Sequence, residues 1–178
     1  MINTLQEAHS RVWTFRRKYS KWWSTPDALD SLRFAYTEAA EALDAHLRQK
    51  GGYARNNERE QDIVSELADC AIMLLTALGP NYEFRPMNVT YSNPSEGYLD
   101  WIAGDVGASL AAYKRWEAIT RKHGRDANRH IYEEGILLAL GFIVNYPGMD
   151  LVPMIDARLE RIRRKHVKEG HDGQDDED

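Results

Sequence analysis

The segment "SELADCAIMLLTAL" at residues 65–78 decides the fold, because its second part is apolar on every side of a helix. Between Cys70 and Leu78 the only polar side chain is that of Thr76. At about 100° per residue these positions point in every direction around a helix axis, so a helix here has no face for solvent. The segment therefore predicts a helix enclosed by neighbouring elements, with Glu66 and Asp69 at the mouth of the enclosed part.

Helical periodicity extends from this segment to most of the chain, and strand-like alternation is nearly absent. Thr25 is the predicted N-cap of a helix that starts at Pro26 and ends at Gly51. Asn57 and Glu60 resemble a capping box for the next helix. We therefore predict an all-α fold, a bundle of about six helices. The predicted helices cover about residues 3–22, 26–50, 58–78, 98–122, 127–145 and 150–168.

Chain length and charge indicate one domain followed by a charged tail. The 178 residues suit a single hydrophobic core. The net charge of −5 comes from the last eight residues, "HDGQDDED", which hold five acids and nothing apolar to bury. We predict a single catalytic domain at residues 1–169, in which 80–130 is an insertion candidate, and a disordered acidic tail at 170–178.

The composition argues against several classes of protein. Without its tail the chain carries no basic surplus, so we expect no nucleic-acid partner. A single cysteine, Cys70, excludes an intrachain disulfide framework. No apolar stretch approaches about 18 residues, and the start of the chain does not resemble a signal peptide. We therefore expect no membrane partner and a cytoplasmic location.

The second predicted helix has two surfaces that can contact other elements. The first, which we expect to be the buried side that faces the bundle, is an apolar stripe formed by Leu29, Leu32, Tyr36, Ala40, Leu43 and Leu47. Glu38 and Glu41 fall nearly opposite this stripe, on the side of Phe34, Ala42 and Ala45. Small residues let another element approach closely, so the two glutamates border a second contact surface.

Two pairs of acids lie three residues apart on consecutive helices, Glu38 with Glu41 and Glu66 with Asp69. This spacing corresponds to about 60° of rotation, so each pair can converge on one point. Unpaired carboxylates beside apolar runs would cost several kcal/mol or would take up protons. Bound divalent cations remove this cost, and carboxylate oxygens suit Mg²⁺ or Mn²⁺. The alternative is that these acids are solvated or paired with nearby arginines.

This acidic motif resembles that of the all-α nucleoside triphosphate pyrophosphatases, the MazG-like superfamily, which includes the dimeric dUTPases and the phosphoribosyl-ATP pyrophosphatases. Glu-x-x-Glu at 38–41 and Glu-x-x-Asp at 66–69 carry the resemblance, which covers about residues 22–79. The segment "LALGFIVNYPGMDLVPMIDARLERIRRKH" at 138–166 is more weakly similar to the closing helix of that family. The resemblance implies a four-helix core, from which the excursion at 80–130 departs.

The resemblance also implies a metal-dependent enzyme with four Mg²⁺ ligands, Glu38, Glu41, Glu66 and Asp69. Such an enzyme hydrolyses a nucleoside triphosphate to the monophosphate and pyrophosphate, with metal ions that position a water in line with the α-phosphorus. Glu41 or Glu38 would accept the proton of this water. Some relatives carry a further glutamate beside the first motif, whereas Thr37 and Ala39 flank Glu38 here. The resemblance specifies neither the nucleobase nor the sugar.

Two further groups of residues are candidates for substrate contacts. Arg158, Arg161 and Lys165 share one side of the last predicted helix and are candidates for binding phosphates. The alternative is a solvated basic face. Trp22 and Trp23 immediately precede the helix that carries the first acidic pair, and their faces could stack on a nucleobase. The alternative is that they anchor the helix turn in the core.

Two other functions compete with hydrolysis. The first is a non-catalytic helical interaction or scaffold protein, in which the acids are structural. The second is a di-iron carboxylate bundle, which typically needs Glu-x-x-His on two helices, and this spacing is absent from the sequence. Because the segments 70–78 and 136–144 are apolar on nearly every side, and because the resembled family is oligomeric, we also expect a homodimer or homotetramer.

Overall fold

The computed structural model describes residues 1–21, 24–51, 60–85, 97–123 and 129–168, which form six α-helices and no strand. The prediction of an all-α fold of about six helices is confirmed. The helices are α1 (Ile2–Lys18), α2 (Ala28–Lys50), α3 (Glu60–Ala77), α4 (Tyr98–His123), α5 (Arg129–Val144) and α6 (Leu151–Lys168). Within the described residues, none of them combines the length and the apolar character needed to span a bilayer. The predicted tail at 170–178 and the capping residue Asn57 lie outside the described residues.

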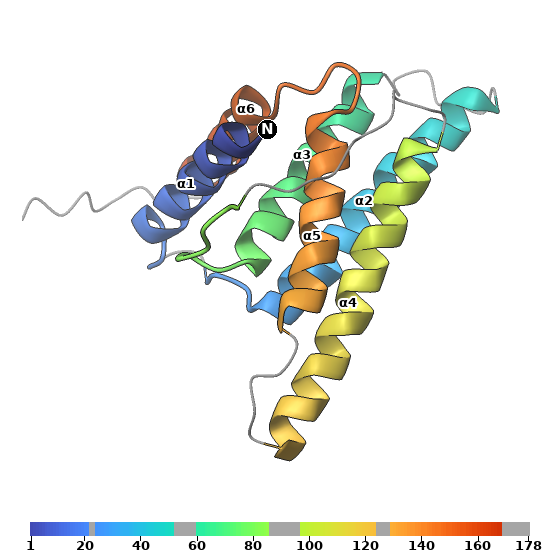
Figure 1. Ribbon diagram of the computed structural model, residues 1–178. Helices are drawn as coiled ribbons and strands as arrows, with labels where there is room; N and C mark the ends of the chain where they lie inside the picture. The colour runs from blue at the N-terminus through green and yellow to red at the C-terminus, as the bar shows by residue number, and fades with distance from the viewer. Residues whose placement is uncertain (22–23, 52–59, 86–96, 124–128, 169–178) are drawn as a thin grey trace, which may run out of the picture.

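Helices α2 to α5 form a four-helix bundle, and α1 and α6 pack together beside it. In the bundle, α2 packs against α3 and α4, and α5 completes the ring by packing against the same two helices. The pair formed by α1 and α6 lies against α3 (Figure 1). Helix α4, which lies inside the predicted insertion at 80–130, is thus a member of the bundle. Its C-terminal end extends beyond the other helices (Figure 1).

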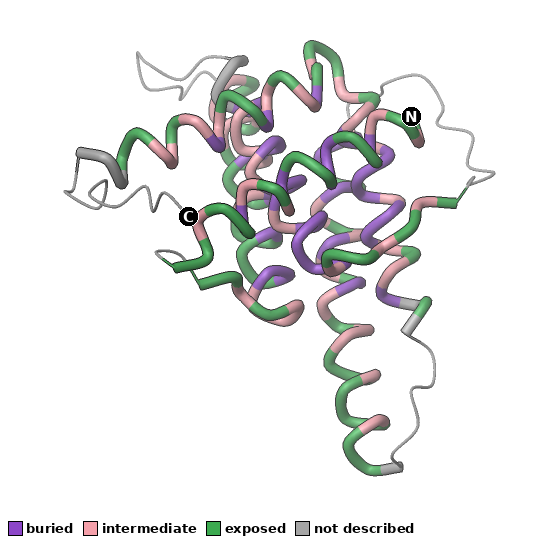
Figure 2. Tube along the Cα trace, turned by 90° about the vertical axis from the view of Figure 1, so that its left-hand side faces the viewer, coloured by how far each residue is buried: buried purple, intermediate pink, exposed green. Residues whose placement is uncertain are grey.

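Helix α3 is the central helix of the molecule, because it contacts α1, α2, α5 and α6. Of the segment predicted to be enclosed, Met73 is half-buried and the other side chains from Cys70 to Leu78 are buried. Buried residues gather where the helices meet, whereas the projecting end of α4 is largely exposed (Figure 2). The neighbours that this segment needs therefore all come from the same chain.

The prediction of which face of α2 is buried is wrong. The buried side chains of this helix are Ser31, Leu32, Ala35, Ala39 and Ala42. Of the predicted apolar stripe only Leu32 is buried, while Tyr36 and Leu47 are 47% and 56% exposed. The distance between packed helices depends on the side chains at the contact, and alanines let α2 approach its neighbours closely. The surface lined by small residues is therefore the main contact surface of α2.

Helix α2 also begins at a different residue from the one predicted. Asp27, not Thr25, is the N-cap, and its carboxylate accepts a hydrogen bond of 2.8 Å from the backbone N–H of Asp30. Aspartate is a stronger N-cap than threonine, which explains the shift, and Pro26 consequently precedes the cap. The C-terminal end is as predicted, because Gly51 is the C-cap.

Polar side chains of α1 attach this helix to α3. His9 Nε2 donates a hydrogen bond of 2.8 Å to the carbonyl oxygen of Gly79, just after α3 ends. Gly79 has a φ of 86°, a left-handed conformation that glycine adopts without strain. The buried Arg16 donates from Nε to Thr76 Oγ1 at 2.9 Å, and its Nη2 lies 3.7 Å from Met73 Sδ. These contacts hold the end of α1 beside the part of α3 that follows Asp69.

Candidate metal centre

Helix α2 brings Glu38 to the edge of its buried face. Glu38 lies three residues after Ala35 and four residues before Ala42, both of which are fully buried. Helical spacing therefore places it on the same side as these alanines, where α2 packs against α3. The Glu38 side chain is half-buried rather than directed into open solvent.

Helix α3 supplies two acids from the opposite side of this contact. Glu66 and Asp69 are half-buried, and the side chains between and beside them, such as Leu67 and Cys70, are fully buried. One carboxylate oxygen from each of Glu38, Glu66 and Asp69 lies within 4.8 Å of the other two. The structure therefore brings together three of the four acids that the sequence singles out.

The fourth acid, Glu41, is placed differently from the other three. Its side chain is exposed, and it is not part of the group within 4.8 Å. Its negative charge is still close enough to raise the pKa of Glu38, one helical turn away. Glu41 therefore lies at the solvent side of the cluster.

Burial and neighbouring acids raise the pKa of Glu38 from 4.5 to about 7. Burial is the largest cause, followed by a hydrogen bond that the protonated Glu38 carboxyl donates to the Glu66 carboxylate, and by the negative charges of Glu66 and Glu41. The positive charge of Arg158 acts in the opposite direction. Near neutral pH, Glu38 can therefore both take up and release a proton, a property that is common in functional sites.

Arg158 of α6 forms an ion pair with Asp69 across the helix contact. Its Nε donates to Asp69 Oδ1 at 2.7 Å, and its Nη2 donates to Asp69 Oδ2. The two side chains are only 21% and 17% exposed. Burial lowers the pKa of Arg158, and the negative charges of Glu66 and Glu38 raise it. Among the described residues, the Arg158 guanidinium thus faces all three clustered acids, and its one positive charge offsets only part of their combined negative charge.

The donor set of the cluster fits a hard divalent cation. Carboxylate oxygens are the ligands that Mg²⁺ and Mn²⁺ prefer, and three of them converge here from two helices. A divalent cation would offset the repulsion between Glu38 and Glu66 and would compete with Arg158 for the oxygens of Asp69. The cluster of Glu38, Glu66 and Asp69 can therefore hold a metal ion.

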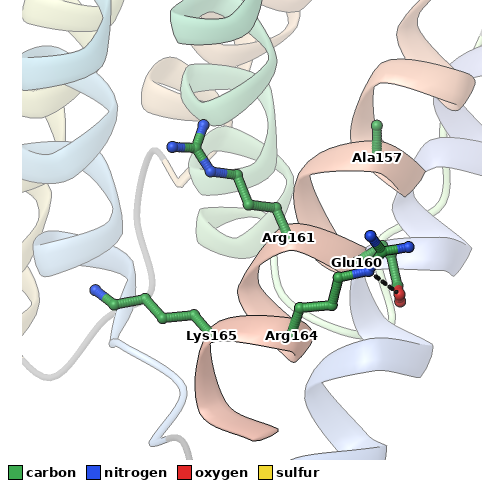
Figure 3. A pocket seen from close by; sticks show the side chains of 5 residues that line it. All are labelled: Ala157, Glu160, Arg161, Arg164 and Lys165. Atoms are coloured by element: carbon green, nitrogen blue, oxygen red, sulfur yellow. Dashed lines mark hydrogen bonds and ion pairs between the residues drawn. The ribbon is translucent and has the colours of Figure 1, made fainter. Parts of the chain in front are cut away.

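A basic depression of about 590 Å³ lies further along α6. Its lining residues are Ala157, Glu160, Arg161, Arg164 and Lys165. Arg161 and Lys165 extend to one side of the helix, and Arg164 folds toward Glu160 on the other side (Figure 3). Two of the three predicted phosphate-binding residues therefore line one depression, whereas the third, Arg158, reaches the metal cluster. The sequence grouped them by helical spacing, which does not reveal the partner of each side chain.

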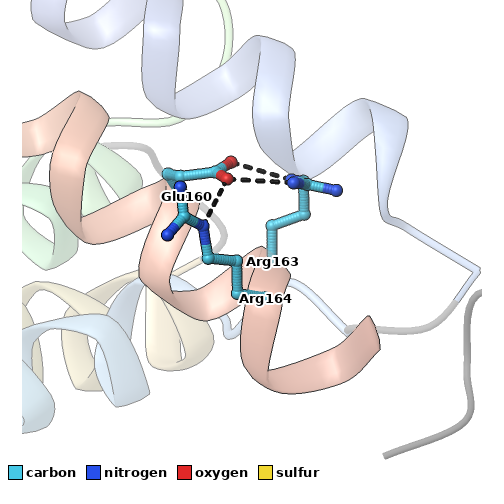
Figure 4. A network of polar contacts seen from close by, with 3 residues as sticks. All are labelled: Glu160, Arg163 and Arg164. Atoms are coloured by element: carbon cyan, nitrogen blue, oxygen red, sulfur yellow. Dashed lines mark hydrogen bonds and ion pairs between the residues drawn. The ribbon is translucent and has the colours of Figure 1, made fainter. Parts of the chain in front are cut away.

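The acid in this depression, Glu160, is fully engaged by its own helix. It accepts hydrogen bonds from Arg163 Nε at 2.7 Å, from Arg163 Nη2 at 2.9 Å and from Arg164 Nε at 2.8 Å (Figure 4). These bonds lower the pKa of Glu160 to about 2, with Arg163 as the larger cause and Arg164 as the second. Glu160 therefore stays ionised and ties down two of the local arginines.

A second cavity, of about 430 Å³, opens beside the acidic cluster and includes Glu38 in its wall. Its other lining residues are Arg16, Ser24, Pro26, Asp30, Phe34 and Met73. The sequence did not single out this cavity, although Phe34 lies one helical turn before Glu38. The predicted base-binding residues Trp22 and Trp23 lie outside the described residues.

Comparisons of the chain with protein-family models, with curated proteins and with solved structures find no significant match. The resemblance to the MazG-like superfamily therefore depends on the acidic motif, and it remains a prediction. The function has to be inferred from the geometry and the charges of the site.

Proposed function

We propose that this protein is a Mg²⁺- or Mn²⁺-dependent nucleoside triphosphate pyrophosphohydrolase, which converts a nucleoside triphosphate to its monophosphate and pyrophosphate. The observation that carries the proposal is the convergence of Glu38, Glu66 and Asp69 within 4.8 Å at a half-buried helix contact. Three half-buried acids held together by tertiary structure beside Arg158 are poorly explained as surface charges. The resemblance of the motif to the MazG-like superfamily points to the same reaction.

The clustered acids and their neighbours have distinct roles in this proposal. Glu38, Glu66 and Asp69 hold the metal, and Glu41 completes the set from the solvent side. A divalent cation bound there would neutralise charge on the phosphate oxygens and help to orient the attacking water. Glu38 or Glu41 accepts the proton of that water.

The phosphates beyond the scissile bond bind the basic depression of α6 in this proposal. Arg161 and Lys165 extend to one side of α6 and line the depression (Figure 3), and helical spacing places Arg158 on the same side. Guanidinium and ammonium groups are the usual partners of phosphate oxygens. Arg158 adjusts the charge of the metal cluster through Asp69, so we assign it a positioning role.

The experiment that tests the proposal is an assay of pyrophosphate release. The full chain is incubated with each of the common ribo- and deoxyribonucleoside triphosphates in Mg²⁺, in Mn²⁺ and in EDTA. We expect metal-dependent release of pyrophosphate and monophosphate in equal amounts from at least one of them. Absence of turnover of every nucleotide with both metals would contradict the proposal that the protein is a hydrolase.

A non-catalytic scaffold is the second candidate, and two observations favour it. Arg158 partly neutralises the acidic cluster without any metal. Large apolar side chains are also exposed, among them Tyr36 and Leu47 on α2 and Trp101 on α4. In this case Asp69→Asn would change the stability or the association of the protein. Neither the native protein nor any variant would release pyrophosphate.

We also propose that the protein acts as a homodimer or homotetramer in the cytoplasm. Helices α2 and α4 pack against each other, and both carry exposed large apolar residues, among them Tyr36 on α2 and Trp101 and Ile119 on α4. Sedimentation analysis of the full chain tests the assembly, and a monomer at all concentrations would contradict it.

A further inference from the structure

The cavity of about 430 Å³ beside Glu38 has walls from both helices that carry the clustered acids. Phe34 is four residues before Glu38 on α2, and Met73 is four residues after Asp69 on α3. Residues four apart lie on the same side of a helix, so each helix places an apolar side chain one turn from its own acid. The cavity therefore adjoins the cluster directly.

We propose that this cavity holds the nucleoside half of the substrate, with Phe34 as the surface on which the nucleobase stacks. The inference rests on the proposed function, because it assigns the part of the nucleotide that the metal cluster does not bind. The volume lies within the range of about 300–1,000 Å³ that is usual for small-molecule sites. A single apolar wall would not indicate a base, but a flat aromatic ring beside a phosphate-handling site does.

The exposure of Phe34 supports a stacking role. Its side chain is 54% exposed although it lies on a helix that buries four smaller residues and one leucine. Met73, on the α3 side of the cavity, is half-buried and contacts Arg16. A base placed against Phe34 would cover apolar surface that otherwise faces water, which favours binding.

The charges of the two surfaces indicate which end of the substrate each would bind. Among the described residues that line the cavity, Asp30 and Glu38 are acids and Arg16, which donates to Thr76, is a cation. The described residues that line the depression on α6 instead include three basic side chains and one acid. A triphosphate is attracted to the second surface and an uncharged nucleoside is compatible with the first, so the α-phosphate falls at the acidic cluster between them.

Asp30 supplies a polar contact that can orient the nucleoside. Its Oδ1 accepts from Arg33 Nη1 at 2.8 Å, which fixes the carboxylate at the rim of the cavity. A carboxylate has further acceptor positions and suits either a base amino group or a sugar hydroxyl. One apolar wall with a few fixed polar groups is the usual composition of a small-molecule site.

The test measures binding without turnover. The α,β-imido analogues of the common deoxynucleoside triphosphates and inorganic tripolyphosphate are titrated into the full chain in Mg²⁺ by calorimetry. The variants are Phe34→Ala, the conservative Phe34→Tyr, and Leu47→Ala as the matched control, since Leu47 is equally exposed on the same helix but outside the cavity. Circular dichroism melts establish that each variant is folded.

We expect Phe34→Ala to weaken binding of the preferred analogue about tenfold, as loss of one base–aromatic stack predicts. Phe34→Tyr should restore most of the affinity, Leu47→Ala should leave it unchanged, and the affinity for tripolyphosphate should be the same in all four proteins. Equal affinities of Phe34→Ala and native protein for every analogue would overturn the assignment, as would failure of the native protein to bind any analogue.

The same preparations separate this inference from the proposed function. Turnover of nucleoside triphosphates by the native protein, together with an unaffected Phe34→Ala variant, overturns only the nucleoside site. Binding that depends on Phe34 without any turnover supports the nucleoside site and overturns only the hydrolase. An equal loss of affinity for tripolyphosphate in Phe34→Ala would also overturn the assignment, because the residue would then act on the phosphates.

Discussion

Glu38 and Glu160 both lie on helices of the same fold, yet the groups around them shift their pKa values in opposite directions. Glu160 accepts three hydrogen bonds from Arg163 and Arg164, and its pKa falls to about 2. Glu38 is half-buried beside another carboxyl, Glu66, and its pKa rises to about 7. The first glutamate is stabilised as an anion, while the second is held where an anion is unfavourable.

The origin of the neighbours explains the difference. Both partners of Glu160 lie three and four residues later on the same helix, so any folded α6 would form this network. Apart from Glu41 on the same helix, the neighbours that affect Glu38 are Glu66 of α3 and Arg158 of α6, so only the complete fold brings the cluster together. An unfavourable cluster that requires tertiary structure indicates a site, whereas a local network indicates only a stable helix.

Removal of a clustered acid should have the largest effect. Glu38→Gln and Asp69→Asn each remove a proposed metal ligand while keeping the size of the side chain. Because metal ions supply several kcal/mol of transition-state stabilisation, we expect metal-dependent pyrophosphate release to fall by about a hundredfold or more. Steady-state assays at saturating Mg²⁺ measure this change.

The matched control for these variants is Asp44→Asn. Asp44 is an exposed acid on the same helix as Glu38, and it pairs with Arg48 one turn later. We expect its activity to stay within about twofold of the native value, since exposed pairs of this kind contribute little. Equal losses in Asp44→Asn and Glu38→Gln would show that the cluster has no special role.

Replacement of Arg158 tests how much this arginine stabilises the acidic cluster in the absence of a metal. Arg158→Met leaves Asp69 partly buried and unpaired, so we expect the metal-free protein to lose about 2 kcal/mol of unfolding free energy. Added Mg²⁺ should reverse much of this loss, because a bound cation replaces the guanidinium and stabilises the folded state. Urea unfolding in EDTA and in Mg²⁺ measures both effects.

Arg164→Met is the counterpart on the exposed network, where the arginine is 71% exposed. We expect no comparable loss of stability and no response to Mg²⁺. A destabilisation of Arg158→Met that is the same in EDTA and in Mg²⁺ would mean that Asp69 does not bind the metal.

The sequence predicted the acidic cluster better than its surroundings, for a physical reason. Helical spacing determines which residues of one helix can converge, so the pairs on α2 and α3 were apparent from the motif. It does not determine how deeply a helix is inserted or which partner a long side chain reaches. Glu41 is therefore more exposed than Glu66, and Arg158 holds Asp69 instead of facing the basic depression.

The fold shows the same division between local and tertiary information. The apolar circumference of 70–78 predicted an enclosed helix, and α3 is enclosed. Helix α2 has two surfaces that could be buried, and its larger apolar side chains favoured the wrong one. Close packing of the helices instead buries Ala35 and Ala42 and leaves Tyr36 exposed. The sequence showed that small residues line one face of α2. Whether this face or the apolar stripe is buried depends on the neighbouring helices.

The pH dependence of stability should distinguish Glu38 from an ordinary glutamate. Its folded-state pKa of about 7 exceeds 4.5, so the folded protein binds a proton that the unfolded chain releases between these values. The unfolding free energy of the metal-free protein should therefore fall as the pH rises from 4.5 to 7. After allowance for the half-exposed position, we expect Glu38→Gln to be more stable than the native protein by about 1–2 kcal/mol at pH 8.

Urea unfolding in EDTA at pH 5 and pH 8 measures this difference. The gain in unfolding free energy from Glu38→Gln should be small at pH 5. Glu38 in the folded native protein is then mostly protonated and carries little unfavourable charge, although it is partly ionised in the unfolded chain. A gain of the same size at both pH values would indicate a packing effect instead of the removal of a charge.

Replacement of Glu160 should have the smallest effect and the opposite dependence on pH. Its folded-state pKa of about 2 lies below 4.5, so any stabilisation is complete above pH 4.5 and is lost as the pH falls toward 2. Because the Glu160 side chain is 39% exposed and its pairs lie within one helix, we expect Glu160→Gln to change the melting temperature only slightly at neutral pH, and less at high salt. Thermal melts at low and high ionic strength measure this change. A large loss in Glu160→Gln that persists in high salt would mean that α6 depends on this network for its position, and the contrast with Glu38 would then no longer separate a local network from a site built by the fold.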